Sequence, residues 1–216
     1  MSSSETADIA VGIGFDFICP WCLIGLRHWR AALHEFGLLY PNRAVDVSWR
    51  GVQLLPDVPD QGLPYQAFYE ARLGGPQAVA LRRAQVQAAA DAVGLRLAFE
   101  RIEKMPNTLH AHALAQRAGE CAGAGSQWRF IERVTQAYFV EAQDIGAGMT
   151  LKRLWGDCDL PAWSEAEDLL ISAPKLQPRR GGAVDSVPSF AFGAGVEIQG
   201  AQSSRVLLRA LQSALR

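Results

Sequence analysis

The sequence predicts an α/β protein in which a domain built on a sheet is interrupted by an inserted all-helical domain. Three observations support this: apolar residues alternate near both ends of the chain, an amphipathic helix follows the first alternating stretch, and roughly 100 residues between them show helical periodicity. Helices that follow one another over such a length are unusual inside one βαβ unit but natural in a domain inserted into it. We expect the sheet domain to comprise residues 8–58 and 170–216, and the helical domain residues 59–169.

The first strand lies just before a pair of cysteines. It is predicted by alternating apolar residues, namely Ile9, Val11, Ile13, Phe15 and Phe17. After Cys22, apolar residues recur every three or four positions until Gly37, which predicts one face of a helix. Cys19 therefore stands where a strand passes into the N-terminus of a helix.

The remaining elements follow in order along the chain. Alternation over residues 45–49 predicts a second strand, and the proline- and aspartate-rich residues 56–64 end the β pattern. Two alternating stretches around a turn at residues 193–195 predict a hairpin, and a last helix from Ser203 would pack on the sheet. Between these sheet elements, helical stretches are predicted at residues 64–73, 76–93, 107–120, 126–140 and 150–155.

Composition excludes several classes of protein. The chain has 216 residues, 49% of them hydrophobic, which is enough for one core plus an insertion. A formal net charge of −1 leaves no electrostatic footprint for nucleic acid or an anionic membrane. No apolar stretch approaches the roughly 18 residues of a membrane span, and the N-terminus lacks the basic segment of a secretory signal. We therefore expect a cytoplasmic protein with no nucleic-acid or membrane partner, and the sequence leaves a homodimer open.

Cys19 and Cys22 are one helical turn apart, which fits a redox pair, half of a metal site or two inert buried thiols. In a reducing compartment a close pair is more often catalytic or metal-binding than a structural disulfide. A structural zinc site needs four ligands, and neither Cys121 nor Cys158 has a cysteine or histidine beside it in the sequence. The spacing of the cysteines and histidines therefore disfavours a metal site. Inert buried thiols remain an alternative because free cysteine is among the most buried residue types.

The position of the pair at a helix start favours redox chemistry. Unpaired backbone N–H groups and the helix dipole stabilise a thiolate there, so the pKa of Cys19 is expected to fall from about 8.5 towards roughly 3.5–7. Pro20 suits the first helical turn, where its missing N–H costs nothing. Cys22, one turn further into the helix, is placed to attack a mixed disulfide formed by Cys19.

Other residues are weaker candidates. Pro188 precedes the hairpin, where pattern alone favours a trans peptide bond because only about 5–6% of X–Pro bonds are cis. Asp16 could accept the proton of Cys22, since a buried carboxyl group binds a proton more readily, although an aspartate that caps the following turn is an equal alternative. Trp21 and Tyr138 could line a substrate groove, but aromatic residues at such spacing are more often part of the core.

Four segments of the chain resemble a known family. "DFICPWCLIG" (16–25), "NTLHAH" (107–112), "VPSF" (187–190) and "GAQ" (200–202) are similar to DsbA-like proteins identified as polyketide-biosynthesis-type dithiol-disulfide isomerases. The resemblance implies a thioredoxin-like fold with a helical insertion, Cys19 as nucleophile, Cys22 as resolving thiol and Pro188 as a cis-proline facing them.

The chain also departs from that family at a few positions. Ser186 and Ser189 flank Val-Pro where glycine and threonine are common, and Gly51 stands where proline is frequent. These departures bear on substrate preference more than on the fold.

We therefore expect a thiol–disulfide oxidoreductase or isomerase that acts on protein or small-molecule thiols and disulfides, with Trp21 and Val187 at the substrate site and no bound cofactor or metal. The alternative is a glutathione-dependent enzyme resembling 2-hydroxychromene-2-carboxylate isomerases and kappa-class glutathione transferases, which usually carry serine in place of Cys19. There glutathione, as thiol co-substrate, would pair with the Val187 backbone and place its γ-glutamyl carboxylate near Ser203 and Ser204. A redox sensor whose disulfide switches a partner is a third hypothesis. The intact Cys-x-x-Cys favours the first.

Overall fold

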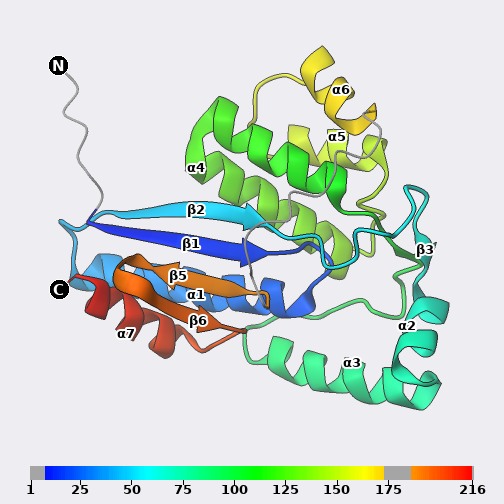
Figure 1. Ribbon diagram of the computed structural model, residues 1–216, viewed down its shortest axis with the longest axis horizontal. Coiled ribbons are helices and arrows are strands. Elements are labelled where there is room, and N and C mark those ends of the chain that lie inside the picture. Colours follow the sequence, from blue (N-terminus) through cyan, green and yellow to red (C-terminus); the bar gives the residue numbers. More distant parts are fainter. Residues whose placement is uncertain (1–7, 173–185, 216) are drawn as a thin grey trace.

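The computed structural model describes residues 8–172 and 186–215. It is built on a four-stranded sheet with the strand order β2-β1-β5-β6 (Figure 1). Two helices that pack against each other, α1 and α7, belong to the same unit. The elements of this unit are β1 (Ile9–Phe15), α1 (Pro20–Leu39), β2 (Val45–Gly51), β5 (Ser189–Phe192), β6 (Val196–Gln199) and α7 (Ser204–Ala214).

The register of the strands brings three segments that are distant in sequence to the same end of the sheet, where β1 and β2 finish and β5 begins. β1 runs parallel to β2, with Phe15 opposite Gly51, and antiparallel to β5, with Gly14 opposite Ser189. The ends of β1 and β2 therefore meet the beginning of β5. The loop from β1 to Cys19 begins at this end of the sheet. The cysteines therefore lie beside the segment that precedes β5.

The core of this unit confirms the periodicity of the first strand and helix. Every second residue of β1 from Ile9 to Phe15 is buried, and α1 buries the face that carries Leu23, Leu26 and Trp29. The Trp29 ring lies 5.8 Å from the ring of Phe190 between centroids, which ties α1 to β5. The helix does not stop at Gly37, as its sequence suggested, but continues to Leu39.

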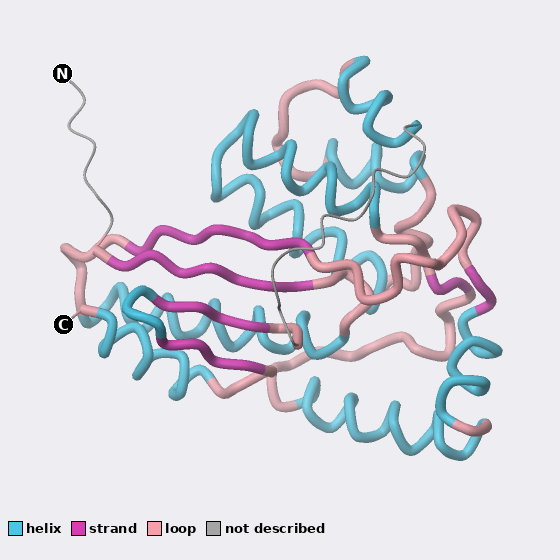
Figure 2. Tube along the Cα trace, viewed as in Figure 1, coloured by secondary structure: helices cyan, strands magenta, loops and turns pink. Residues whose placement is uncertain are grey.

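A helical insertion between β2 and β5 confirms the predicted architecture (Figures 1 and 2). The residue-level boundaries of the two domains stay predictions. The insertion contains α2 (Tyr65–Leu73), α3 (Pro76–Asp91), α4 (Leu109–Phe139), α5 (Gly148–Gly156) and α6 (Glu165–Ser172), with a small ribbon of β3 (Leu63–Pro64) and β4 (Lys104–Met105).

The structure differs from the sequence-based expectation at several points of the insertion and at the β5–β6 hairpin. The helices predicted at 107–120 and 126–140 form one element, α4, that is interrupted at Gly123, where φ is 81° and ψ is 171°. This backbone conformation is one that glycine adopts without steric cost. Helix α6 and the β3–β4 ribbon were not predicted. In the hairpin, the expected turn is a short 3₁₀ segment, η1 (Gly193–Gly195).

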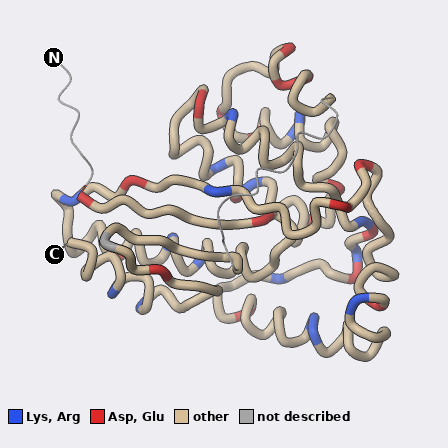
Figure 3. The backbone as a smooth tube through the Cα atoms, viewed as in Figure 1, with Lys and Arg blue, Asp and Glu red and all other residues tan. Residues whose placement is uncertain are grey.

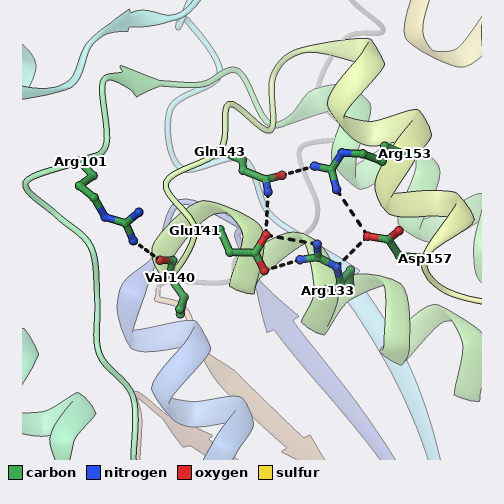
Figure 4. A network of polar contacts seen from close by, with 7 residues as sticks. All are labelled: Arg101, Arg133, Val140, Glu141, Gln143, Arg153 and Asp157. Carbon is green, nitrogen blue, oxygen red and sulfur yellow. Dashed lines mark hydrogen bonds and ion pairs between the residues drawn. The ribbon is translucent and has the colours of Figure 1, made fainter.

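A network of polar side chains joins the end of α4 to α5 (Figure 4). Arg133 contacts Glu141 at 2.8 Å and Asp157 at 3.1 Å. Arg153 contacts Asp157 at 3.5 Å and donates a hydrogen bond to Gln143. Because these groups are partly exposed, each pair contributes little stability on its own.

Positively and negatively charged residues are interspersed along the chain (Figure 3). This arrangement accords with the formal net charge of −1. In the part of the chain that the structure describes, no helix combines the length and the apolar character that a membrane span requires.

Candidate active site

Cys19 is the N-cap residue of α1. Its backbone is extended, with φ −93° and ψ 108°, and Pro20 occupies the first helical turn behind it. Three residues after β1 form the turn that leads to this position, and the Cys19 N–H closes the turn by donating to the Asp16 carbonyl at 3.2 Å. The Cys19 thiol therefore lies at the positive end of the helix dipole, as the sequence predicted.

The environments of the two thiols push their pKa values in opposite directions. The pKa of Cys19 is lowered, chiefly because the Cys22 thiol donates a hydrogen bond to its thiolate, with further help from the backbone N–H groups of Trp21 and Cys22. The pKa of Cys22 is raised well above its usual value, first by burial and then by the adjacent Cys19. Cys19 is 6% exposed and Cys22 only 1%. Cys19 is thus the more acidic thiol of the pair, and Cys22 the one that holds its proton more firmly.

The segment before β5 faces this pair. The Cys19 Sγ lies 3.7 Å from the carbonyl oxygen of Val187, and the Val187–Pro188 peptide bond is cis. The pattern-based preference for a trans bond was wrong, and the cis-proline implied by the family resemblance is confirmed. The Pro188 carbonyl is held by the Gly200 N–H at 2.7 Å, so the loop after β6 fixes the far side of this segment.

Asp16 has no exposed surface, and its charge is close enough to both thiols to raise their pKa values. One carboxylate oxygen accepts the Leu54 N–H at 2.8 Å, and the other lies 3.1 Å from Nε2 of His112. Its carboxyl group does not cap α1, which has no side-chain cap. The capping interpretation is therefore wrong, whereas the proton-acceptor interpretation stays a prediction.

The other predicted residues lie at different distances from this centre. Trp21 is half-buried at the start of α1, and the guanidinium of Arg82 lies over its ring at 5.8 Å. Ser203 is the exposed N-cap of α7 and makes no side-chain capping bond. Tyr138 is 1% exposed and donates to the Lys104 carbonyl, so it belongs to the core of the insertion and does not line a groove.

Comparison with known proteins places this arrangement in a family. A sequence model described as the DSBA-like thioredoxin domain matches residues 10–212. The chain belongs to this family. A search of curated proteins found no significant match.

Solved structures share the fold of this DSBA-like protein. A protein described as a probable DsbA oxidoreductase from Streptomyces coelicolor matches with a TM-score of 0.79 and 24% identity, over 95% of this chain and 89% of that one. The cytosolic disulfide reductase DsbM from Pseudomonas aeruginosa, solved with GSH, matches with 0.59 and 19%, over 95% of each chain. A 2-hydroxychromene-2-carboxylate isomerase matches with 0.54 and 13%, over 95% and 94%. The predicted thioredoxin-like fold with a helical insertion is confirmed.

Sequence reasoning missed two contributors to the site of this DSBA-like protein. Tyr69 of α2 is close enough to Cys19 for the thiolate charge to raise its pKa, although burial raises it more. Leu54, just after β2, supplies a backbone N–H to Asp16. Neither residue stands in a recognisable motif. Only the tertiary fold brings the loop after β2 and the first helix of the insertion to the end of β1.

The remaining cysteines lie apart from the pair. Cys121 is half-buried on α4, where its thiol donates weakly to the Ala118 carbonyl at 3.8 Å. Cys158 is buried after α5, and burial raises its pKa to about 11. None of the four cysteines forms a disulfide in this structure. Within residues 8–172 and 186–215, no group of three or more potential metal ligands comes together.

Proposed function

We propose that this DSBA-like protein is a thiol–disulfide oxidoreductase in which Cys19 forms the mixed disulfide with substrate and Cys22 resolves it. The observation that supports this most is the division of roles between the thiols. Cys19 stands at a helix start 3.7 Å from the Val187 carbonyl, with a lowered pKa, and the buried Cys22 keeps its proton. Exchange needs a thiolate that attacks and a second thiol held in reserve.

The reaction proceeds in two balanced steps. The Cys19 thiolate attacks one sulfur of a substrate disulfide, forms the mixed disulfide and releases the other sulfur as a thiolate. Cys22 then gives up its proton and attacks the Cys19 Sγ. The Cys19–Cys22 disulfide forms, and the second substrate sulfur leaves as a thiolate. The substrate is reduced and the protein oxidised, and the reverse sequence oxidises a dithiol.

Asp16 is the proposed acceptor of the Cys22 proton. Its carboxyl group is buried, and its charge contributes to the raised pKa of Cys22, so the two groups lie in one electrostatic environment. A buried carboxylate next to a thiol of high pKa is a suitable general base, because removal of the thiol proton to bulk water would otherwise be slow.

Pro188, Val187 and Trp21 form the proposed substrate site. An extended substrate would approach Cys19 along the Val187 backbone, which lies beside the thiol. The Trp21 ring, held under Arg82, borders the same helix start and offers an apolar surface to the residues that flank a substrate cysteine. Proteins and small molecules that carry thiols or disulfides both fit this description.

Substitution of Cys22 tests the mechanism. Cys22→Ser should accumulate mixed disulfides on Cys19 when the protein is incubated with a disulfide-containing peptide, and mass spectrometry after alkylation identifies the linked cysteine. Cys19→Ser should give no adduct at either position of the pair, and Cys121→Ser should behave as the unsubstituted protein. The mechanism is rejected if Cys22→Ser turns over as fast as the unsubstituted protein.

A glutathione-dependent isomerase or transferase is the second candidate. The cavity near the start of α7 favours it: Ser204 lines a space of about 750 Å³ together with Arg27 and His28, where a carboxylate would meet positive charge and helix N–H groups. That activity needs no second thiol, so Cys22→Ser would leave it intact. The same variant therefore separates the two candidates.

The reduction potential of the pair decides the direction of exchange. Equilibration in glutathione buffers, with alkylation and mass spectrometry, measures it. A reduction potential of roughly −200 to −120 mV would indicate an oxidase or isomerase. A potential near or below roughly −270 mV would indicate a reductase. The cytoplasmic location that the sequence predicts favours the reductase. If no poise yields the Cys19–Cys22 disulfide, the dithiol mechanism fails.

A further inference from the structure

His112 reaches the buried carboxyl group of Asp16 from a distant part of the chain. It lies in the first turn of α4, 96 positions from Asp16, and its Nε2 atom is 3.1 Å from the carboxylate. The ring packs against the aromatic rings of Phe15 and Phe17, with centroid distances of 5.2 Å and 4.8 Å, and these two rings also contact each other at 5.1 Å. This packing fixes the plane of the imidazole, so the contact with Asp16 is held by the core.

The opposite edge of the same ring has a different environment. The Nδ1 atom is buried and has no hydrogen-bond partner among the described residues. The ring also lines a cavity of about 990 Å³ that lies between α4 and the end of β2. The two ring nitrogens thus face different groups: Nε2 faces the Asp16 carboxylate, and the buried Nδ1 faces the backbone of Gly51 at the end of β2.

Gly51 makes room for this ring. A Cβ atom at position 51 would overlap the imidazole, and Nδ1 is the atom it would meet first. The absence of a side chain at the end of β2 is therefore a condition for the present position of His112. This gives a physical reason for a glycine at a position where related sequences often carry proline.

We propose that His112 is a positioning residue that keeps Asp16 ionised, and therefore able to accept the Cys22 proton, by donating its Nε2–H to the carboxylate. The inference rests on the proposed thiol–disulfide exchange. A hydrogen bond donated to the charged form of a carboxyl group favours ionisation, whereas burial opposes it. Without His112, the Leu54 N–H would be the remaining hydrogen-bond donor to the Asp16 carboxylate among the described residues.

The charged groups around the pair support this assignment. The charge of Asp16 raises the pKa values of Cys19 and Cys22 at the start of α1. It also raises the pKa of the Tyr138 hydroxyl on α4. At the cavity, Arg117 and Glu120 are the charged residues that line the wall beside His112, and Arg117 is paired with Glu167 of α6 at 2.9 Å. Among residues 8–172 and 186–215, no lysine or arginine pairs with Asp16, so His112 is its basic partner.

Rapid-quench measurements separate the two chemical steps. The reduced protein is mixed with excess glutathione disulfide, quenched with acid and analysed by mass spectrometry, which distinguishes the mixed disulfide from the Cys19–Cys22 disulfide. In His112→Phe, the first step should keep its rate. The second should slow roughly tenfold at pH 7, and its pH midpoint should rise by about one unit, which corresponds to one lost hydrogen bond to a charged group.

Further variants separate chemistry from packing. His112→Gln retains an amide donor and should recover part of the rate, whereas Gly51→Ala displaces the ring and should slow the same step. In an Asp16→Asn background, His112→Phe should have no further effect. His110→Gln, two positions away on the same helix, is the matched control and should resolve normally.

Two outcomes overturn different claims. If His112→Phe and Gly51→Ala resolve the mixed disulfide with the pH profile of the unsubstituted protein, the role of His112 is rejected and the proposed function stands. If the unsubstituted protein itself never converts the mixed disulfide into the Cys19–Cys22 disulfide, the proposed function fails before His112 is tested.

Discussion

Gly25 of α1 lies against Pro188, so closely that a Cβ atom at position 25 would come within 2.9 Å of the proline Cγ. The absence of a side chain at Gly25 lets the helix approach the segment that faces Cys19. We expect Gly25→Ala to push Pro188 and Val187 away from the thiol. The cost of such overpacking is about 1–3 kcal/mol in the free energy of unfolding, measurable in urea, and the rate of mixed-disulfide formation should fall with it.

Gly37, on the same helix, is the matched control for this prediction. No atom lies within 4 Å of a Cβ at position 37, and the residue is exposed. Gly37→Ala should stabilise the protein by roughly 0.5–1 kcal/mol, because alanine loses less conformational entropy in a helix. If Gly25→Ala increased the free energy of unfolding by the same amount, Pro188 would be able to move away from the added methyl group without cost.

A buried carboxylate anchors α6 to α4, and its contribution should depend on pH. Glu167 is 2% exposed; burial opposes its ionisation, but hydrogen bonds from Ser164 and Arg117 lower its pKa to about 2. Because the folded value lies below the usual 4.5, the stabilisation is present above pH 4.5 and is lost as the pH falls towards 2. Glu167→Gln should therefore cost about 1–2 kcal/mol at pH 7, since Arg117 is partly exposed and its pairing is screened.

Urea unfolding at pH 7 and at pH 3 checks this dependence. The difference between Glu167→Gln and the unsubstituted protein should shrink at the lower pH. Glu165→Gln, an exposed residue on the same helix, should change the stability little at either pH. A constant difference for Glu167→Gln would mean that the loss of a hydrogen-bond acceptor for Ser164 and Arg117, and not the loss of charge, causes the destabilisation.

The regular elements of the fold could be predicted from sequence wherever their apolar pattern was long enough. β1 and α1 bury the faces that their periodicity indicated. The strands β3 and β4 have two residues each, which is too short for any period to show. Helix α6 carried a signal that was not used: Ser164 and Glu167 form a capping box, in which the Ser164 N–H donates to the Glu167 carboxylate at 2.9 Å.

The candidate site likewise has a part that could be predicted from sequence and a part that could not. The cysteine pair and the helix start beneath it are local in sequence, so motif and periodicity together placed them. The partners of Asp16 are not local: Leu54 follows another strand, and His112 begins a helix of the insertion. A pattern in one segment carries no information about which distant side chain will meet it. Hence the hydrogen bonds of Asp16 became visible only in the folded chain, whereas the burial of Tyr138 agrees with the core position that its spacing favoured.

Removal of the Cys22 thiol should raise the pKa of Cys19. The largest cause of the lowered pKa is the hydrogen bond that Cys22 donates to the Cys19 thiolate, and Cys22→Ala deletes this donor while it leaves the backbone N–H groups in place. Because less of Cys19 is then ionised near neutral pH, its alkylation by iodoacetamide should slow at pH 7. The midpoint of its pH profile should move upward, towards the pKa of a free cysteine.

Peptide mapping by mass spectrometry follows Cys19 alone in this experiment. Cys121→Ala, which removes a thiol on α4 away from the pair, should leave the Cys19 profile where it is. An unchanged midpoint in Cys22→Ala would assign the stabilisation of the thiolate to the backbone N–H groups at the start of α1. Cys22 would then act only as the resolving thiol, and the first step of exchange would proceed equally well without it.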